Sequence, residues 1–156
     1  MMNKFFKTRS AYSWILLLGL VLGVVGLVIY ILNSTTGYLA GQDAGVTVIV
    51  LSVISLLSML VLFFMGDKVK KFRDTLFIVS GVFIVVSICL FAYARVSIAA
   101  DVWFIPVNYP PAEGTTLTVA IVGIVFYVLS LICVLISAFG SNLSKEIDTV
   151  TTEKEA

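Results

Sequence analysis

The chain has no histidine, two cysteines and three prolines among its 156 residues, and only 12% of its residues are charged. The lack of histidine removes the commonest general base, the usual proton switch and the commonest metal ligand. Cys89 and Cys133 lie in separate apolar runs, without the CxxC spacing of redox or zinc sites. We therefore expect no cofactor, no metal site and no disulfide, with Cys89 facing lipid or a partner.

The scarcity of charge also argues against the ordinary soluble classes of protein. Soluble domains have about a quarter of their residues charged, whereas this chain is 60% hydrophobic. Its net charge of +1 leaves no broad basic face to neutralise phosphates, so we expect no nucleic-acid partner. The composition indicates an integral membrane protein whose first partner is the lipid bilayer.

Four uncharged runs are long enough to cross a bilayer, since a spanning helix needs about 20 apolar residues. They cover residues 11–32, 44–65, 75–94 and 115–139. Because backbone groups must be satisfied inside lipid, each run should be helical. We predict an all-α integral membrane fold with four transmembrane helices in an antiparallel bundle. No small-residue cleavage motif follows the first run, so we expect an uncleaved anchor rather than a signal peptide.

The basic residues are concentrated in three of the segments outside the spans. Residues 1–10 contain three, residues 66–74 contain four and residues 140–156 contain two, which is nine of the ten. By the positive-inside rule these segments are cytoplasmic, and so are both termini. The two outer loops are then residues 33–43 and 95–114. The short loops favour a multi-pass protein of a bacterial plasma membrane.

The cytoplasmic segments have different expected properties. Residues 1–10 form a basic N-terminus, and residues 66–74 close a tight basic hairpin between the second and third spans. The basic side chains of this hairpin are Lys68, Lys70, Lys71 and Arg73. We expect them to meet anionic lipid headgroups, with docking of a cytoplasmic protein as the alternative. Residues 140–156 are polar and mixed in charge, so we expect a mobile tail.

Each span carries one face of small or weakly polar residues. Gly19, Gly23 and Gly26 share a face of the first span, and the first two have the GxxxG spacing that lets helices approach closely. The corresponding residues of the other spans are Ser52, Ser55, Ser58, Ser80, Ser87, Gly123, Tyr127 and Ser130. We expect these faces to pack helix against helix.

Two alternatives stay open for the same faces. The glycines could instead form a groove for lipid or substrate. A polar path through the membrane could be lined by Ser52, Ser55, Ser58, Tyr127 and Ser130.

The second outer loop is aromatic and contains all three prolines. Trp103, Phe104 and Tyr109 suit a segment resting on the bilayer surface, where amphipathic rings concentrate. The alternatives are a partner-binding surface shared with Tyr38 of the first outer loop, or a substrate lid. Arg95 is expected to mark the membrane interface, with its side chain extended outward into water.

The spans contain no ionisable Asp, Glu, Lys or Arg, the residues on which proton- and ion-coupled transport usually depends. Asp101 and Glu113 flank the aromatic loop and are the best candidates for a catalytic carboxylate pair. We expect both to be solvated surface charges, and the protein not to be an enzyme.

These features favour a small non-catalytic accessory or assembly subunit of a larger transport or envelope complex. Its expected partners are other membrane-protein subunits, in a hetero- or homo-oligomer. The alternative is a homo-oligomeric channel or small-solute transporter with a serine-lined path. A membrane enzyme is the third hypothesis.

Overall fold

A computed structural model describes residues 11–40, 45–65, 72–104 and 111–154. These residues form helices and no strand. The elements are α2 (Ala11–Thr35), the short 3-10 helix η1 (Gly37–Leu39), α3 (Val46–Met65), α4 (Arg73–Tyr93), α5 (Val96–Phe104) and α6 (Pro111–Lys154).

Four of these helices are long and apolar enough to cross a membrane, namely α2, α3, α4 and residues 112–140 of α6. The sequence-based prediction of an all-α chain with four membrane-spanning helices is confirmed in this sense. The predicted runs and the helices agree in number and differ by a few residues at their ends. Which end of the bundle faces the cytoplasm stays a prediction.

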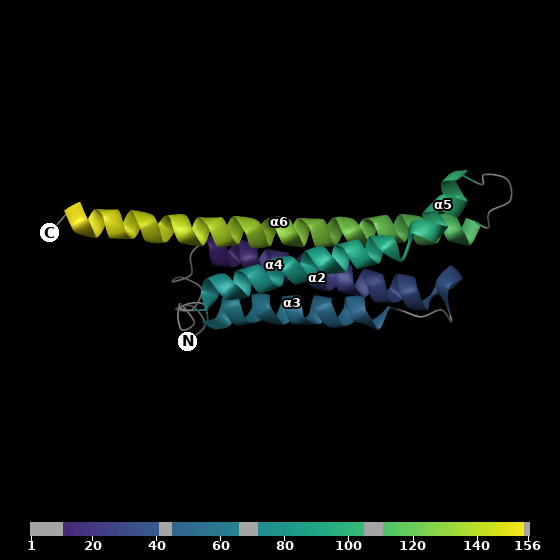
Figure 1. Cartoon of the computed structure of the whole chain (residues 1–156), viewed down its shortest axis with the longest axis horizontal. Helices are drawn as coiled ribbons and strands as arrows, with labels where there is room; N and C mark the ends of the chain where they lie inside the picture. Colours follow the sequence, from purple (N-terminus) through teal and green to yellow (C-terminus); the bar gives the residue numbers. More distant parts are fainter. Residues whose placement is uncertain (1–10, 41–44, 66–71, 105–110, 155–156) are drawn as a thin grey trace.

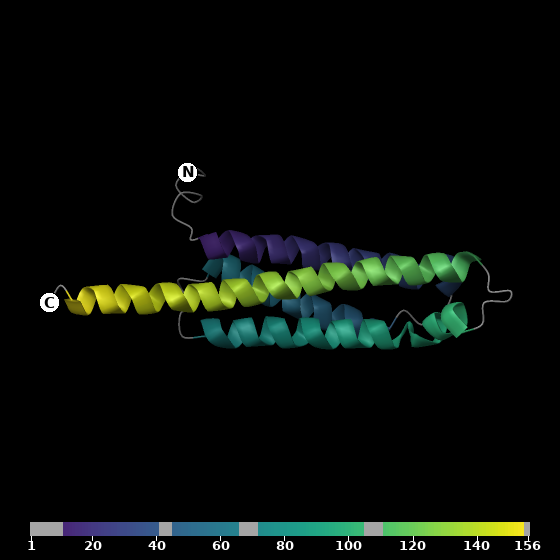
Figure 2. The ribbon, with the colours of Figure 1, turned by 90° about the horizontal axis from the view of Figure 1, so that it is seen from above.

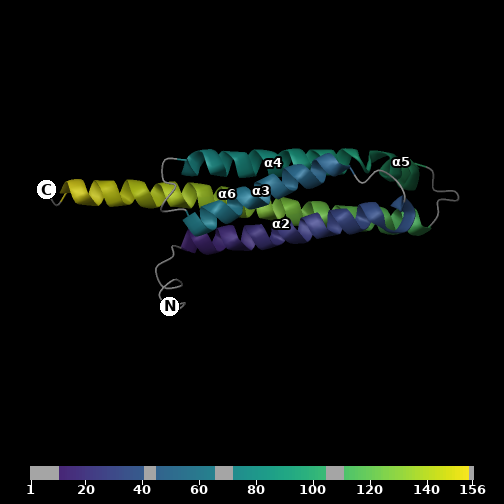
Figure 3. The same ribbon diagram turned by 90° about the horizontal axis from the view of Figure 1, so that it is seen from below.

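The four long helices lie side by side and alternate in direction. Figure 1 shows α2 and α4 running from one end of the bundle to the other, with α3 and α6 running back. The most extensive contacts join α2 to α6 and α3 to α4, and further contacts join α4 to α6 and α2 to α3. Each long helix therefore has two main neighbours, and these contacts close a four-membered ring. Figures 2 and 3 show the bundle from above and from below.

The buried side chains form two clusters along this ring. One contains Leu16, Met59, Leu62, Ile84 and Val134. The other contains Tyr30, Val48, Phe91, Ala120 and Tyr127. In the second cluster the Phe91 ring meets the rings of Tyr30 and Tyr127 edge to face, with centroids 4.7 and 6.4 Å apart. Every long helix contributes to each cluster or packs against it.

The segment after α4 differs from the expected loop because it contains a helix, α5. Ile98 of α5 is buried against Leu39 of η1 and Leu117 of α6. Ala99 and Val102 of α5 pack against the same cluster, and these apolar contacts explain why the short helix folds onto the bundle. The next helix, α6, begins at Pro111, a residue suited to a first helical turn because its missing N–H would have no partner there.

The C-terminal segment, for which a mobile tail was expected, continues the last helix, and its mobility stays a prediction. Helix α6 is 44 residues long and continues through Lys154. It extends past the ends of the other helices in Figure 1. Adding residues to a helix that already exists avoids the cost of nucleation, so a polar segment with no apolar periodicity can still continue it.

Candidate functional site

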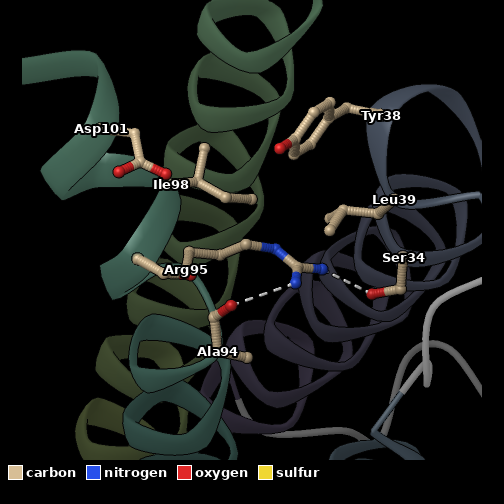
Figure 4. A pocket seen from close by; sticks show the side chains of 8 residues that line it. Ser34, Tyr38, Leu39, Ala94, Arg95, Ile98 and Asp101 are labelled. Carbon is tan, nitrogen blue, oxygen red and sulfur yellow. Dashed lines mark hydrogen bonds between the residues drawn. The ribbon is translucent and has the colours of Figure 1, made fainter. Parts of the chain in front are cut away.

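Arg95 lies between α4 and α5 and is the centre of a buried polar cluster. Its side chain is only 8% exposed. The Nε donates to Oδ1 of Asn33 at 2.9 Å, and Nη2 donates to Oγ of Ser34 at 2.6 Å. The Nη1 donates to the carbonyl of the preceding residue, Ala94, at 3.4 Å. Figure 4 shows the guanidinium reaching from the α4–α5 side toward Ser34.

Asn33 extends this cluster to a third part of the bundle. Its Nδ2 donates to the backbone carbonyl of Thr116 at 2.8 Å. A single buried amide therefore joins the last turn of α2, the α4–α5 junction and the beginning of α6. We call the end of the bundle that holds this cluster the Arg95 end.

The charge of Arg95 is stabilised by neutral groups. Its three hydrogen-bond acceptors among the described residues are an amide, a hydroxyl and a carbonyl oxygen. Its guanidinium carbon also lies 5.6 Å from the centre of the Phe91 ring and 5.9 Å from that of Tyr30, close enough for cation–π attraction. Burial lowers the pKa of Arg95 from its ordinary value, because removing a cation from water disfavours the charged form.

A pocket of about 190 Å³ opens beside the guanidinium. Its lining residues are Ser34, Tyr38, Leu39, Ala94, Arg95, Ser97, Ile98 and Asp101. In Figure 4, Asp101 and Tyr38 stand on opposite sides of the space above Arg95. The pocket thus presents one cation, one carboxylate and several hydroxyls within a small volume.

The two carboxylates considered as a catalytic pair have different surroundings. Asp101 is exposed and lines the pocket, as expected of a solvated charge. Glu113 is only 7% exposed, so its predicted solvation is wrong. Hydrogen bonding to Glu113 and the negative charge of Glu113 are the main causes that raise the pKa of Tyr38 above its ordinary value. Glu113 therefore lies at the start of α6 against η1 rather than in open water.

The predicted orientation of Arg95 is also wrong. An arginine just after a transmembrane run suggested a side chain extended into water, but the side chain turns inward. Its acceptors, Asn33 and Ser34, directly follow the first apolar run in the sequence. The sequence did contain a signal for this pairing. Two polar residues follow one apolar run, and an arginine follows another that ends on the same side of the predicted bundle.

The small polar residues of the spans lie inside the bundle. The Oγ of Ser52 donates to Oγ of Ser87 at 3.2 Å and shares a 2.8 Å hydrogen bond with the hydroxyl of Tyr127. The Oγ of Ser55 donates to the carbonyl of Ser80 at 2.8 Å. These contacts join α3 to α4 and α6.

Two further serines of the spans, Ser130 and Ser58, differ in the helix to which they bond. Ser130 donates to the carbonyl of Gly19 at 2.7 Å, which joins α6 to α2. Ser58 differs, because its Oγ donates to Ile54 of its own helix at 2.9 Å.

The glycine face of α2 packs against other helices of the same chain. A Cβ added to Gly19 would lie 2.8 Å from Cβ of Cys133, and one added to Gly26 would lie 3.2 Å from the Tyr127 ring. At Gly23 the added atom would lie 2.8 Å from Leu56 of α3. The partner of the GxxxG face is therefore α6, together with α3.

Gly123 is the corresponding close contact on α6. An added Cβ there would meet Ile29 at 2.9 Å and the Phe91 ring at 3.0 Å. The two cysteines are free, with Cys133 buried and Cys89 exposed.

The residues expected at surfaces lie as follows. Trp103 and Phe104 are 66% and 81% exposed on α5, and Tyr38 is 40% exposed on η1. Arg73 is the first residue of α4, and its Nε lies 3.9 Å from the carboxylate of Asp74. Outside the described residues lie Tyr109, Lys68, Lys70 and Lys71.

The described part of the chain contains no group of three or more His, Cys, Asp or Glu residues placed to hold a metal ion. Its site is instead a buried arginine beside a small amphoteric pocket. Neither a protein-family model, nor a curated protein, nor a solved structure matches this chain.

Proposed function

We propose that this chain is a small non-catalytic accessory or assembly subunit of a larger membrane complex. The observation that carries the proposal is the use of the inward hydroxyls in helix-to-helix hydrogen bonds. Ser52, Ser55 and Ser130 are each at most 1% exposed. Each of them forms a hydrogen bond to a helix other than its own.

The packing around these hydroxyls supports a structural role over a pathway. A conducting path needs polar groups that face water along the length of the membrane. Here the hydroxyl of Tyr127 occupies the space beside Ser52, and neighbouring side chains leave no room for a Cβ on the glycines of α2. The polar face of each helix thus serves to hold the ring together.

The Arg95 end supplies a surface for a partner. Trp103 and Phe104 project from α5, while Ile98 of the same helix anchors it to the bundle. Aromatic residues held on an anchored helix lose little conformational freedom on binding and are favoured in protein interfaces. We define Tyr38, Trp103 and Phe104 as the aromatic surface, and assign to it the contact with a second membrane-protein subunit.

The proposed setting is a plasma membrane, with the Arg95 end outside and both termini in the cytoplasm. The distribution of lysine and arginine supports this orientation. The aromatic surface would then meet the extracytoplasmic side of its partner.

Photo-crosslinking in native membranes tests the proposal. A photoreactive residue at Phe104 should give one discrete adduct, and the protein in that adduct should co-purify with the unmodified chain. The matched control is the same residue at Val82, an apolar position of α4 that is 52% exposed, which should label lipid. Replacing Tyr38, Trp103 and Phe104 by serine should abolish co-purification while the chain still inserts.

Two outcomes contradict the subunit proposal. One is recovery of the chain as a monomer from every native preparation, with no adduct at Phe104. The other is solute flux through vesicles containing the purified chain that Ser55→Leu abolishes, which would favour the channel.

A further inference from the structure

The pocket beside Arg95 has the chemistry of a ligand site that the subunit role does not require. We propose that it binds a zwitterionic group in which a phosphate lies next to an ammonium, as in the phosphoethanolamine headgroup of a phospholipid. The phosphate would lie on Arg95 and the ammonium on Asp101. The pocket can bind this group whether or not the chain has a protein partner.

The buried guanidinium of Arg95 favours a bound anion. Arg95 is only 8% exposed, and its acceptors among the described residues are neutral oxygens. Buried cations in proteins are normally paired with an anion, because desolvating an unpaired charge is costly. The cation–π contacts with Phe91 and Tyr30 reduce this demand without supplying a negative charge.

The guanidinium of Arg95 also has N–H donors that no acceptor among the described residues uses. Arginine has five N–H groups, and the structure uses one on each of its three nitrogens. Within the described segments, two N–H groups therefore stay available at a side chain that lines the pocket. Phosphate oxygens are among the acceptors that a guanidinium binds most strongly.

Asp101 lines the same pocket. No ion pair within 4.0 Å joins it to Arg95 among the described residues, so the two charges face the pocket separately. A simple anion would meet repulsion from this carboxylate, and a simple cation would meet repulsion from Arg95. A ligand that carries both charges on neighbouring atoms satisfies both groups.

The position and the size of the pocket also suit a lipid headgroup. The pocket is lined by Ala94 and Arg95, which directly follow the last residue of the α4 span, Tyr93. This is the depth at which lipid headgroups meet the end of a spanning helix. Its volume of about 190 Å³ far exceeds the ~10–15 Å³ that one water molecule requires.

Binding of defined lipids to the purified full-length chain tests the proposal. Native mass spectrometry in detergent would compare phosphatidylethanolamine with phosphatidylglycerol, which has the phosphate but no ammonium. The chain should retain phosphatidylethanolamine preferentially. Asp101→Asn removes an exposed carboxylate without altering the Arg95 cluster, and should weaken this retention by about fivefold. Retention of phosphatidylglycerol should not fall, because its phosphate no longer meets the repulsion of the carboxylate.

Asp74→Asn is the matched control. It removes an exposed carboxylate at the opposite end of α4 and should not weaken the retention of phosphatidylethanolamine. Glycerophosphoethanolamine, which lacks acyl chains, identifies the source of the headgroup. Displacement of the lipid by this probe would assign the site to the headgroup alone, and persistence of the lipid would show that its chains contribute.

Two results overturn the proposal. One is equal retention of the two lipids by the unmodified chain, with no effect of Asp101→Asn, which would leave the pocket to water. The other is an equal loss of retention in Asp101→Asn and Asp74→Asn, which would make the effect one of net charge.

Discussion

The Nε of Arg95 donates to Oδ1 of Asn33 at 2.9 Å, although 62 residues separate the two along the chain. The same amide donates from Nδ2 to the carbonyl of Thr116. Together these bonds fix α2, the α4–α5 junction and α6 at one end of the bundle. The rest of the ring depends mainly on apolar packing and single hydroxyls.

Asn33→Ala should therefore destabilise the protein more than most polar substitutions. It leaves the buried guanidinium of Arg95 without one acceptor and removes the bond from α2 to the carbonyl of Thr116. We expect a loss of about 2–3 kcal/mol in the free energy of unfolding, measured by reversible unfolding in mixed micelles. Thr35→Ala is the control, because that hydroxyl is exposed and bonds within its own helix. Equal stability of the two variants would show that the cluster is not structurally important.

Gly19 and Gly81 provide a matched pair for the packing of α2 on α6. Gly19→Ala places a methyl group 2.8 Å from Cβ of Cys133, whereas nothing lies within 4 Å of a Cβ at Gly81. We expect Gly19→Ala to lower stability by about 1–3 kcal/mol. Gly81→Ala should be neutral or stabilising by up to about 1 kcal/mol, because alanine favours helix. Thermal unfolding in detergent measures both, and a neutral Gly19→Ala would contradict the close approach.

Ser52 and Ser58 separate bonds between helices from bonds within one helix. Ser52→Ala breaks contacts with Ser87 and Tyr127 on two other helices. Ser58→Ala removes a bond to Ile54 of the same helix. Hydrogen bonds between membrane helices contribute about 0.6 kcal/mol on average and at most ~1.7. We expect about 1 kcal/mol for Ser52→Ala and less than half of this for Ser58→Ala, by the same unfolding assay.

Tyr38 predicts a pH dependence at the Arg95 end. Its pKa is raised above 10.0, first by hydrogen bonding to Glu113 and then by the charge of Glu113. A raised pKa means that the contact contributes fully below pH 10.0 and is lost as the pH rises through the higher folded-state value. The difference in melting temperature between the unmodified chain and Tyr38→Phe should thus be constant from pH 7 to about 9.5 and shrink above pH 10. In a Glu113→Gln background, which removes the main causes of the raised pKa, the same difference should depend less on pH above 10.

Sidedness can be checked by cysteine labelling in a background where Cys89 and Cys133 are serine. Ser97→Cys at the Arg95 end should react with an impermeant maleimide in intact cells. Thr75→Cys, in the first turn of α4, should react after the membrane is permeabilised. The reverse pattern would place the Arg95 end in the cytoplasm and refute the positive-inside assignment.

Local sequence patterns predicted the features that depend on neighbouring residues in one helix. Length and apolarity identified the four spans, and the 100° spacing placed Gly19, Gly23 and Gly26 on one face. The environments of Arg95 and Glu113 were not predictable in this way. Each depends on a partner from a distant part of the chain, Asn33 for Arg95 and Tyr38 for Glu113, and no local pattern carries that pairing. Helix α5 was missed because its nine residues are too few to establish a period.

The unbroken length of α6 has a mechanical consequence. Its 44 residues correspond to a rod of about 66 Å at ~1.5 Å per residue, roughly twice the ~30 Å hydrocarbon thickness of a bilayer. The carbonyl of Thr116, held by Asn33, lies near one end of this rod. A tilt of one degree at that end would displace the other by about 1 Å. Helix α6 therefore connects the Arg95 end mechanically to the opposite end of the bundle, where it extends beyond the other three spans.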